Sequence, residues 1–101
     1  MKKLKSMCWG SSAVVLDTDG KVAKVDYGDG ITREVFIGIS EGRVEKGDLV
    51  VVHAGVIITK LTEESILEQI SFIRETLGEE GELMAQMYKN ILRLAEELKK
   101  R

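Results

Sequence analysis

Hydrophobic and polar residues alternate along the first part of the chain and recur at helical spacing along the rest. Short runs rich in Val and Ile, separated by Gly and Asp, predict strands at 12–16, 21–27, 31–39, 48–54 and 56–61. Turns are expected at 17–20 and at 28–30, where glycine adopts a positive φ at low cost. Gly55 interrupts the last apolar run, which suggests a bulge, a bend or the close approach of another backbone segment.

From residue 62 onward the pattern predicts two helices. Thr62 offers a hydroxyl as N-cap, Glu63 and Glu64 suit the positive end of the helix dipole, and Gly78 suits the end of the first helix. We expect the apolar stripes of both helices to pack against the strands or against each other. An exposed second stripe would instead be available to a partner. The first stripe is Ile66, Ile70, Ile73 and Leu77, and the second is Met84, Met87, Tyr88, Ile91, Leu94, Ala95 and Leu98.

The predicted strands also indicate how the sheet is arranged. Five short strands joined by tight turns would leave one face of a flat sheet bare, whereas a closed barrel hides the sheet edges and encloses a core. We therefore expect a mostly β fold with C-terminal α structure, a small OB-like β-barrel followed by two helices. Residues 1–61 would form the barrel with an N-terminal cysteine arm, and residues 62–101 a helical extension of the same compact domain.

Composition and charge narrow the classes of function. A net charge of −2 and only 5% aromatic residues argue against nucleic-acid binding. No apolar run approaches the roughly 20 residues of a membrane span, and the segment after the lysine-rich start is too short and polar for a signal peptide, so we expect a cytoplasmic protein. No paired carboxylates, phosphate loop or Ser/His/Asp arrangement stands out, which argues against an enzyme.

The chain has one cysteine and one histidine, and both are candidates for chemistry. Cys8 precedes the first strand, is followed by Trp9, and lies near three lysines that favour the metal-binding thiolate. His53 ends an apolar strand beside Ala54 and Gly55. The competing interpretations are a buried hydrophobic cysteine and a hydrogen-bonded structural histidine. Two ligands are too few for a structural zinc site.

Three stretches of the chain resemble the HypC/HupF family. Met7-Cys8 is similar to the Met-Cys start of these proteins. Val25-Asp26-Tyr27-Gly28, followed by Arg33-Glu34-Val35, is similar to their V-D-F-G … R-x-V segment. Residues 47–58 follow the family pattern G-D-Y/W-V-L-V-H-A-G-F-A almost position by position. The resemblance covers residues 7–77 and implies an OB-like barrel with a C-terminal helix.

The resemblance further implies an accessory chaperone, not an enzyme, in the maturation of nickel–iron hydrogenases. Such proteins partner a HypD-type scaffold, on which iron acquires cyanide and carbon monoxide, and deliver the Fe(CN)2CO unit to the hydrogenase large-subunit precursor. Cys8 would be the iron-binding and partner-contacting thiolate, and His53 a metal ligand or its support. The partner-binding surface would also include Trp9, Gly10, Ala54 and Gly55. Iron would be bound transiently and shared with the partner, because the chain offers only two suitable ligands.

The sequence also departs from the family pattern. Ser12-Ala13 stands where Pro-Gly is usual, Trp9 replaces an aliphatic residue, and six residues precede Met7. If translation starts at Met1 rather than at Met7, Cys8 has no free α-amine. The helix over 81–101 extends beyond the expected family core and could change the partner or form a homodimer. Because of these departures, an alternative function is that of a divergent paralogue that acts as a protein-interaction or oligomerisation module. A further alternative, based on the barrel alone, is an OB-fold nucleic-acid binder.

Overall fold

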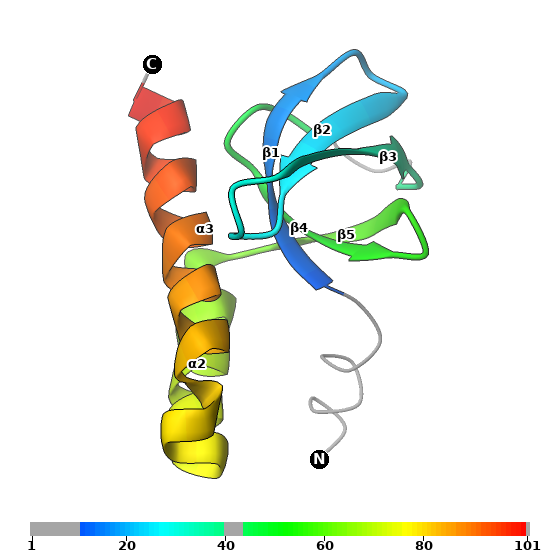
Figure 1. Ribbon diagram of the computed structural model, residues 1–101. Coiled ribbons are helices and arrows are strands. Elements are labelled where there is room, and N and C mark those ends of the chain that lie inside the picture. Colours follow the sequence, from blue (N-terminus) through cyan, green and yellow to red (C-terminus); the bar gives the residue numbers. More distant parts are fainter. Residues whose placement is uncertain (1–10, 40–43, 101) are drawn as a thin grey trace.

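The computed structural model describes residues 11–39 and 44–100 and shows a β-barrel beside a pair of helices (Figure 1). The strands are β1 (Ser11–Thr18), β2 (Val22–Asp26), β3 (Thr32–Ile37), β4 (Leu49–His53) and β5 (Val56–Leu61). The helices that follow are α2 (Glu63–Leu77) and α3 (Glu82–Lys100), joined by the 3-10 turn η1 (Gly78–Gly81). All five predicted strands and both predicted helices are therefore present.

The five strands close into a barrel in the order β1-β2-β3-β5-β4, and β4 pairs back onto β1. β3 and β5 run parallel, with Phe36 opposite Val56 and Ile37 opposite Ile57, and every other neighbouring pair is antiparallel. This arrangement is consistent with the small closed Greek-key barrel of an OB-like fold. The predicted fold, an OB-like barrel followed by two helices, is confirmed.

The core has two parts that meet at β1. Because successive side chains of a strand point to opposite faces, Ala13 and Val15 point into the barrel, while Val14 points toward the helices. The barrel interior contains Ala13, Val15, Ala23, Val25, Val35, Val44, Val50, Val52 and Ile57. The layer between barrel and helices contains Val14, Leu49, Ile66, Ile70, Ile73, Ala85, Ile91 and Ala95. Residues 12–15 of β1 are therefore buried on both faces of the strand.

Gly55 belongs to a tight hairpin turn. Ala54 and Gly55 have φ values of 53° and 79°, and His53 and Val56 face each other across them. Two central residues with positive φ characterise the type I′ turn, which suits the twist of a hairpin. Of the three suggestions for Gly55, the bend is correct. The bulge lies instead between Val51 and Val52, and no atom of the described residues lies within 4 Å of the place where a Gly55 Cβ would be.

The helices begin, end and pack largely as expected. The Thr62 side chain accepts a hydrogen bond from the Ser65 N–H at 3.1 Å, and Gly78 ends α2 with φ 58°. α2 leads away from the barrel, and α3 returns beside it and continues along the barrel (Figure 1). Ile91 is buried between helices and barrel, so the second stripe packs within the chain. Met84, at the start of that stripe, is 47% exposed and is the exception. Among the helices described, none is long and apolar enough to cross a bilayer.

Candidate functional site

The first residues of β1 lie beside the end of β4. Ser11 is paired with Val52, so His53 is the next residue along β4 at the point where the cysteine-bearing segment joins the barrel. Cys8, Trp9 and Gly10 lie outside the described residues. An extended chain advances at most ~3.6 Å per residue, which keeps the Cys8 Cα within about 11 Å of the Ser11 Cα. The fold thus joins the two predicted metal-binding residues to neighbouring strand ends.

The hairpin that carries His53 is exposed and firmly built. His53, Ala54 and Gly55 are all exposed, and the Phe36 N–H donates a 2.9 Å hydrogen bond to the Gly55 carbonyl, which ties the turn to β3. Within 11–39 and 44–100, no three His, Cys, Asp or Glu side chains gather closely enough to hold a metal ion. Among these residues, His53 therefore does not belong to a group of three or more such side chains.

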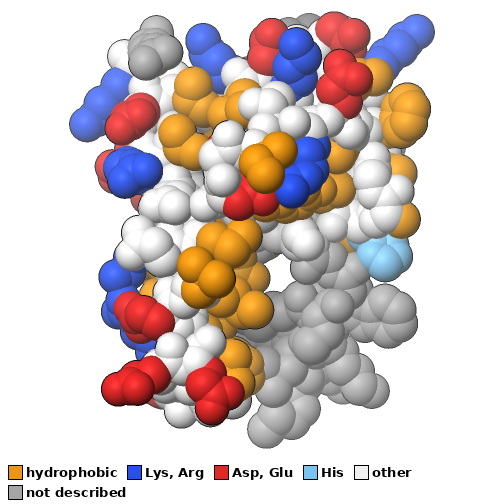
Figure 2. Space-filling view, in the orientation of Figure 1, with side chains coloured by type: hydrophobic (Ala, Val, Ile, Leu, Met, Phe, Trp, Pro, Cys, Tyr) orange, Lys and Arg blue, Asp and Glu red, His pale blue; other side chains and the backbone are white. Residues whose placement is uncertain are grey.

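On another side of β1, an apolar groove of about 680 Å³ lies between the helices and the barrel. We call it the α2–α3 groove. Its wall includes Ser11 and Ser12 from the barrel, and Phe72, Leu77, Leu83, Met84 and Met87 from the helical pair. Leu83 is 76% exposed and Leu77 is 45% exposed. Figure 2 shows hydrophobic side chains gathered over the helices below the barrel.

The wall of the groove also contains polar side chains. Ser12 and Gln69 are both buried, and the Ser12 hydroxyl donates to the Gln69 side-chain carbonyl at 3.3 Å. Burial raises the pKa of the Tyr88 phenol, and a hydrogen bond with Ser12 opposes that rise in part. Ser12, Gln69 and Tyr88 thus place hydroxyl and amide groups beside the apolar side chains of the groove.

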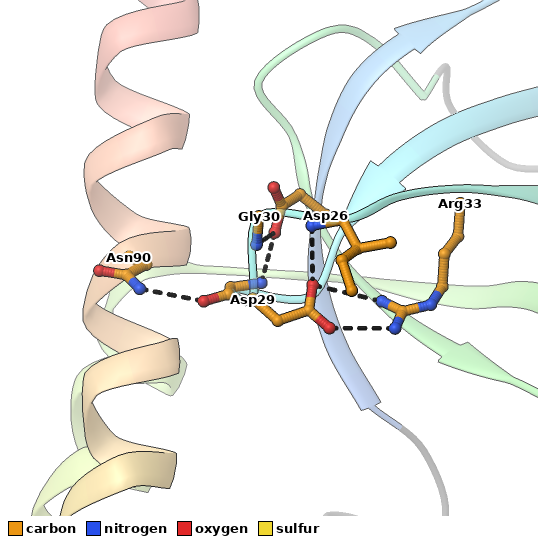
Figure 3. A network of polar contacts seen from close by, with 7 residues as sticks. Asp26, Asp29, Gly30, Arg33 and Asn90 are labelled. Atoms are coloured by element: carbon orange, nitrogen blue, oxygen red, sulfur yellow. Dashed lines mark hydrogen bonds and ion pairs between the residues drawn. The ribbon is translucent and has the colours of Figure 1, made fainter.

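The turn after β2 fixes α3 against the barrel (Figure 3). The buried Asp26 carboxylate accepts hydrogen bonds from the Gly28 N–H at 2.6 Å and the Gly30 N–H at 3.2 Å. The Asn90 side-chain amide on α3 donates to the Gly28 carbonyl at 2.9 Å. A Cβ at Gly28 would overlap the backbone of Met87, so the helix lies directly on this glycine. The segment 25–28 therefore docks a helix as well as turning the chain.

The same turn supports one wall of the groove. The Arg33 guanidinium forms an ion pair with Asp29 at 3.0 Å and lies 4.9 Å from the centroid of the Tyr27 ring, which lines the groove. The hydrogen bond from Arg33 holds the pKa of the Asp29 carboxyl below its usual value, and the same contact raises the pKa of Arg33. Tyr27 thus has a cation–π contact with Arg33 on one face of its ring.

Sequence reasoning missed this groove and the polar residues beside it. Phe72 lies only at the flank of the predicted first stripe, and Leu83 and Gln69 fall outside both stripes. The available signal was Leu83 itself, a large apolar residue that stands directly before Met84 and outside both predicted stripes.

Comparison with known proteins identifies a family. The model of the HupF/HypC family matches residues 7–73. The match includes Cys8, the turn after β2, the His53 hairpin and most of α2, and it leaves α3 outside. A search of curated proteins finds no significant match.

Proposed function

The chain belongs to the HupF/HypC family of hydrogenase maturation chaperones, and we propose that it carries or helps assemble an Fe(CN)2CO unit together with a HypD-type scaffold. It would then deliver the unit to the large-subunit precursor of a nickel–iron hydrogenase. One observation carries this proposal: the family match includes both Cys8 and His53, and the pairing of Ser11 with Val52 joins their segments at one end of the barrel.

The chemistry of the two side chains suits such a cargo. A thiolate from Cys8 is a soft ligand for electron-rich iron that carries cyanide and carbon monoxide, and a neutral imidazole from His53 is a common borderline ligand. Two side chains do not complete a coordination sphere, so the scaffold and the diatomic groups would supply the rest. An incomplete set of protein ligands favours transfer, because fewer protein bonds must break when the iron moves on.

The two segments contribute differently to this site. The type I′ turn at Ala54 and Gly55 and its hydrogen bond to Phe36 hold the hairpin in one shape, so His53 is presented from a rigid element. Trp9 and Gly10 join Cys8 to β1, so the thiol is two residues away from the first strand in the sequence.

The surroundings of the thiol support the same role. Lys2, Lys3 and Lys5 add positive charge near Cys8 in the sequence, which stabilises the thiolate. A cysteine that works as a thiolate is best preserved in a reducing compartment, and we infer a cytoplasmic location on this ground.

Co-purification with a HypD-type scaffold tests the proposal. The scaffold should retain the wild-type chain, lose Cys8→Ser and bind His53→Ala more weakly. Thr59→Ala changes an exposed residue of β5 and serves as the matched surface control, expected to bind like wild type. Circular dichroism of each variant checks that the barrel is intact. Full retention of Cys8→Ser by the scaffold would contradict the role given to the thiolate.

A homodimer through the C-terminal helix stays a prediction. Ile91 and Ala95 of the second stripe are buried within the chain, so a dimer would have to use exposed residues such as Leu83 and Met84. Removing α3 is an unsuitable test, because it would uncover the layer between barrel and helices. Light scattering of the full chain over a range of concentrations, compared with Leu83→Lys, measures the assembly directly.

A further inference from the structure

We propose that the α2–α3 groove is the seat of Trp9 from the chain's own N-terminal segment. The indole ring would lie among the apolar side chains of the two helices and would anchor the segment that carries Cys8. The contact between Trp9 and the groove is independent of the proposed function. Its consequence, that Cys8 is held between the groove and the His53 hairpin for work on iron, rests on that function.

The length of the chain allows Trp9 to reach the groove. Trp9 is two residues before Ser11, so its Cα lies within about 7 Å of the Ser11 Cα. Ser11 and Ser12 themselves line the groove. A ring tethered this closely is present at a high effective concentration, and it needs far less intrinsic affinity than a free ligand would need.

The size and lining of the groove match an indole ring. Its volume of about 680 Å³ lies within the usual range of pockets for small organic ligands. Phe72, Leu83 and two methionines offer an apolar surface, and methionine sulfur makes favourable contacts with aromatic rings. Tryptophan also needs an acceptor for its N–H when buried, and the Ser12 and Tyr88 hydroxyls are candidates.

The exposed apolar side chains around the groove would be stabilised if another apolar group covered them. Phe72, Leu77, Leu83 and Met84 are each 39% exposed or more, and they form one continuous surface around the groove. A segment of a partner or of a second copy could also cover this surface. Trp9 is favoured because it is the largest apolar side chain of the segment joined to Ser11 and needs no association step.

The single tryptophan of the chain makes the test direct. Fluorescence of the full chain, without scaffold or iron, reports on Trp9 alone when the indole is excited selectively. We expect emission at shorter wavelength than that of N-acetyltryptophanamide and weaker quenching by acrylamide. We also expect the methyl groups of Met84 and Met87 to show ring-current shifts in methyl NMR spectra that disappear in Trp9→Ala.

Charged substitutions in the groove wall test whether the Trp9 indole binds there. Leu83→Lys and Met84→Lys, at exposed positions of the groove wall, should move the emission to longer wavelength and restore quenching. Leu67→Lys replaces a leucine that is 53% exposed on α2 and does not line the groove, so it should leave the spectrum unchanged. Circular dichroism confirms that all three variants are folded.

Three results would overturn the proposal. The first is a wild-type emission spectrum like that of the free amino-acid amide. The second is a short-wavelength emission that Leu83→Lys and Met84→Lys leave unchanged, which would seat the indole elsewhere. The third is a spectrum that changes on dilution, which would assign the groove to a second copy. None of these measurements uses the scaffold, so a failure of the proposed function would leave them unaffected.

Discussion

Replacing Gly28 with alanine should loosen the attachment of α3 to the barrel. Gly28 has φ 97°, and an added Cβ would lie 2.7 Å from the carbonyl carbon of Met87 and closer still to its oxygen. These are backbone atoms of a helix, so no rotamer change relieves the overlap. The helix has to shift, and Ile91 and Ala95 would lose part of their packing.

The cost has two parts that can be separated. An L-residue in this region of φ costs about 1–2 kcal/mol, and forcing extra volume into a packed interface costs a further ~1–3 kcal/mol. Gly30 lies in the same turn with φ 81°, but an added Cβ there would meet no atom of residues 11–39 and 44–100 within 4 Å. Gly30→Ala should therefore show the conformational cost alone, and Gly28→Ala should be less stable by about 1–3 kcal/mol beyond it.

Urea unfolding followed by circular dichroism measures this difference. With an m-value of about 1 kcal/mol/M for a chain of this size, the midpoint of Gly28→Ala should fall about 1–3 M below that of Gly30→Ala. If the two variants have equal m-values, the difference between their midpoints measures the difference in their free energies of unfolding. Equal midpoints would refute the reasoning, because they would mean that α3 does not lie on this turn.

Three other substitutions test single contacts. Asn90→Ala should lower the free energy of unfolding by about 1 kcal/mol, because the turn carbonyl loses its donor, and urea unfolding checks this. Thr62→Ala should cost about 1 kcal/mol by removing the N-cap of α2, whereas Thr59→Ala should cost little by the same assay. The pKa of Asp29 is held below 3.8 chiefly by Arg33, so its contribution to stability is complete above pH 3.8 and is lost as the pH falls through the lowered pKa. Unfolding midpoints of Asp29→Asn should therefore fall less than those of wild type when the pH is lowered from about 5, and parallel curves would contradict this.

Features that depend on local sequence were predictable. The strands follow from alternating residues over 21–39 and from a continuous apolar run over 48–54. The start of α2 follows from the Thr62 hydroxyl, and its end from a glycine at positive φ. The sequence leaves three possibilities for the hairpin turn because Ala54 occupies a position with φ 53°, where Asn or Gly is the usual signal. Without that signal, the apolar run on both sides resembles one interrupted strand.

Features that join distant parts of the chain were not predictable. Gln69 has the character of a surface residue of α2, yet it is buried against Ser12, 57 positions earlier. The α2–α3 groove is formed by β1, the turn after β2 and both helices, and no short stretch of sequence records its shape. The pairing of Ser11 with Val52 places His53 beside the start of β1, and strand periodicity alone does not determine this pairing.

Infrared spectroscopy of the anaerobically purified complex with a HypD-type scaffold tests the central claim most directly. The account predicts cyanide and carbon monoxide stretching bands in the wild-type complex, with band positions that shift in His53→Ala and stay unchanged in Thr59→Ala. It also predicts that the infrared spectrum of purified Cys8→Ser shows no cyanide or carbon monoxide bands. A well-folded wild-type chain that forms the complex but never shows these bands would contradict the claim that its cargo is an Fe(CN)2CO unit.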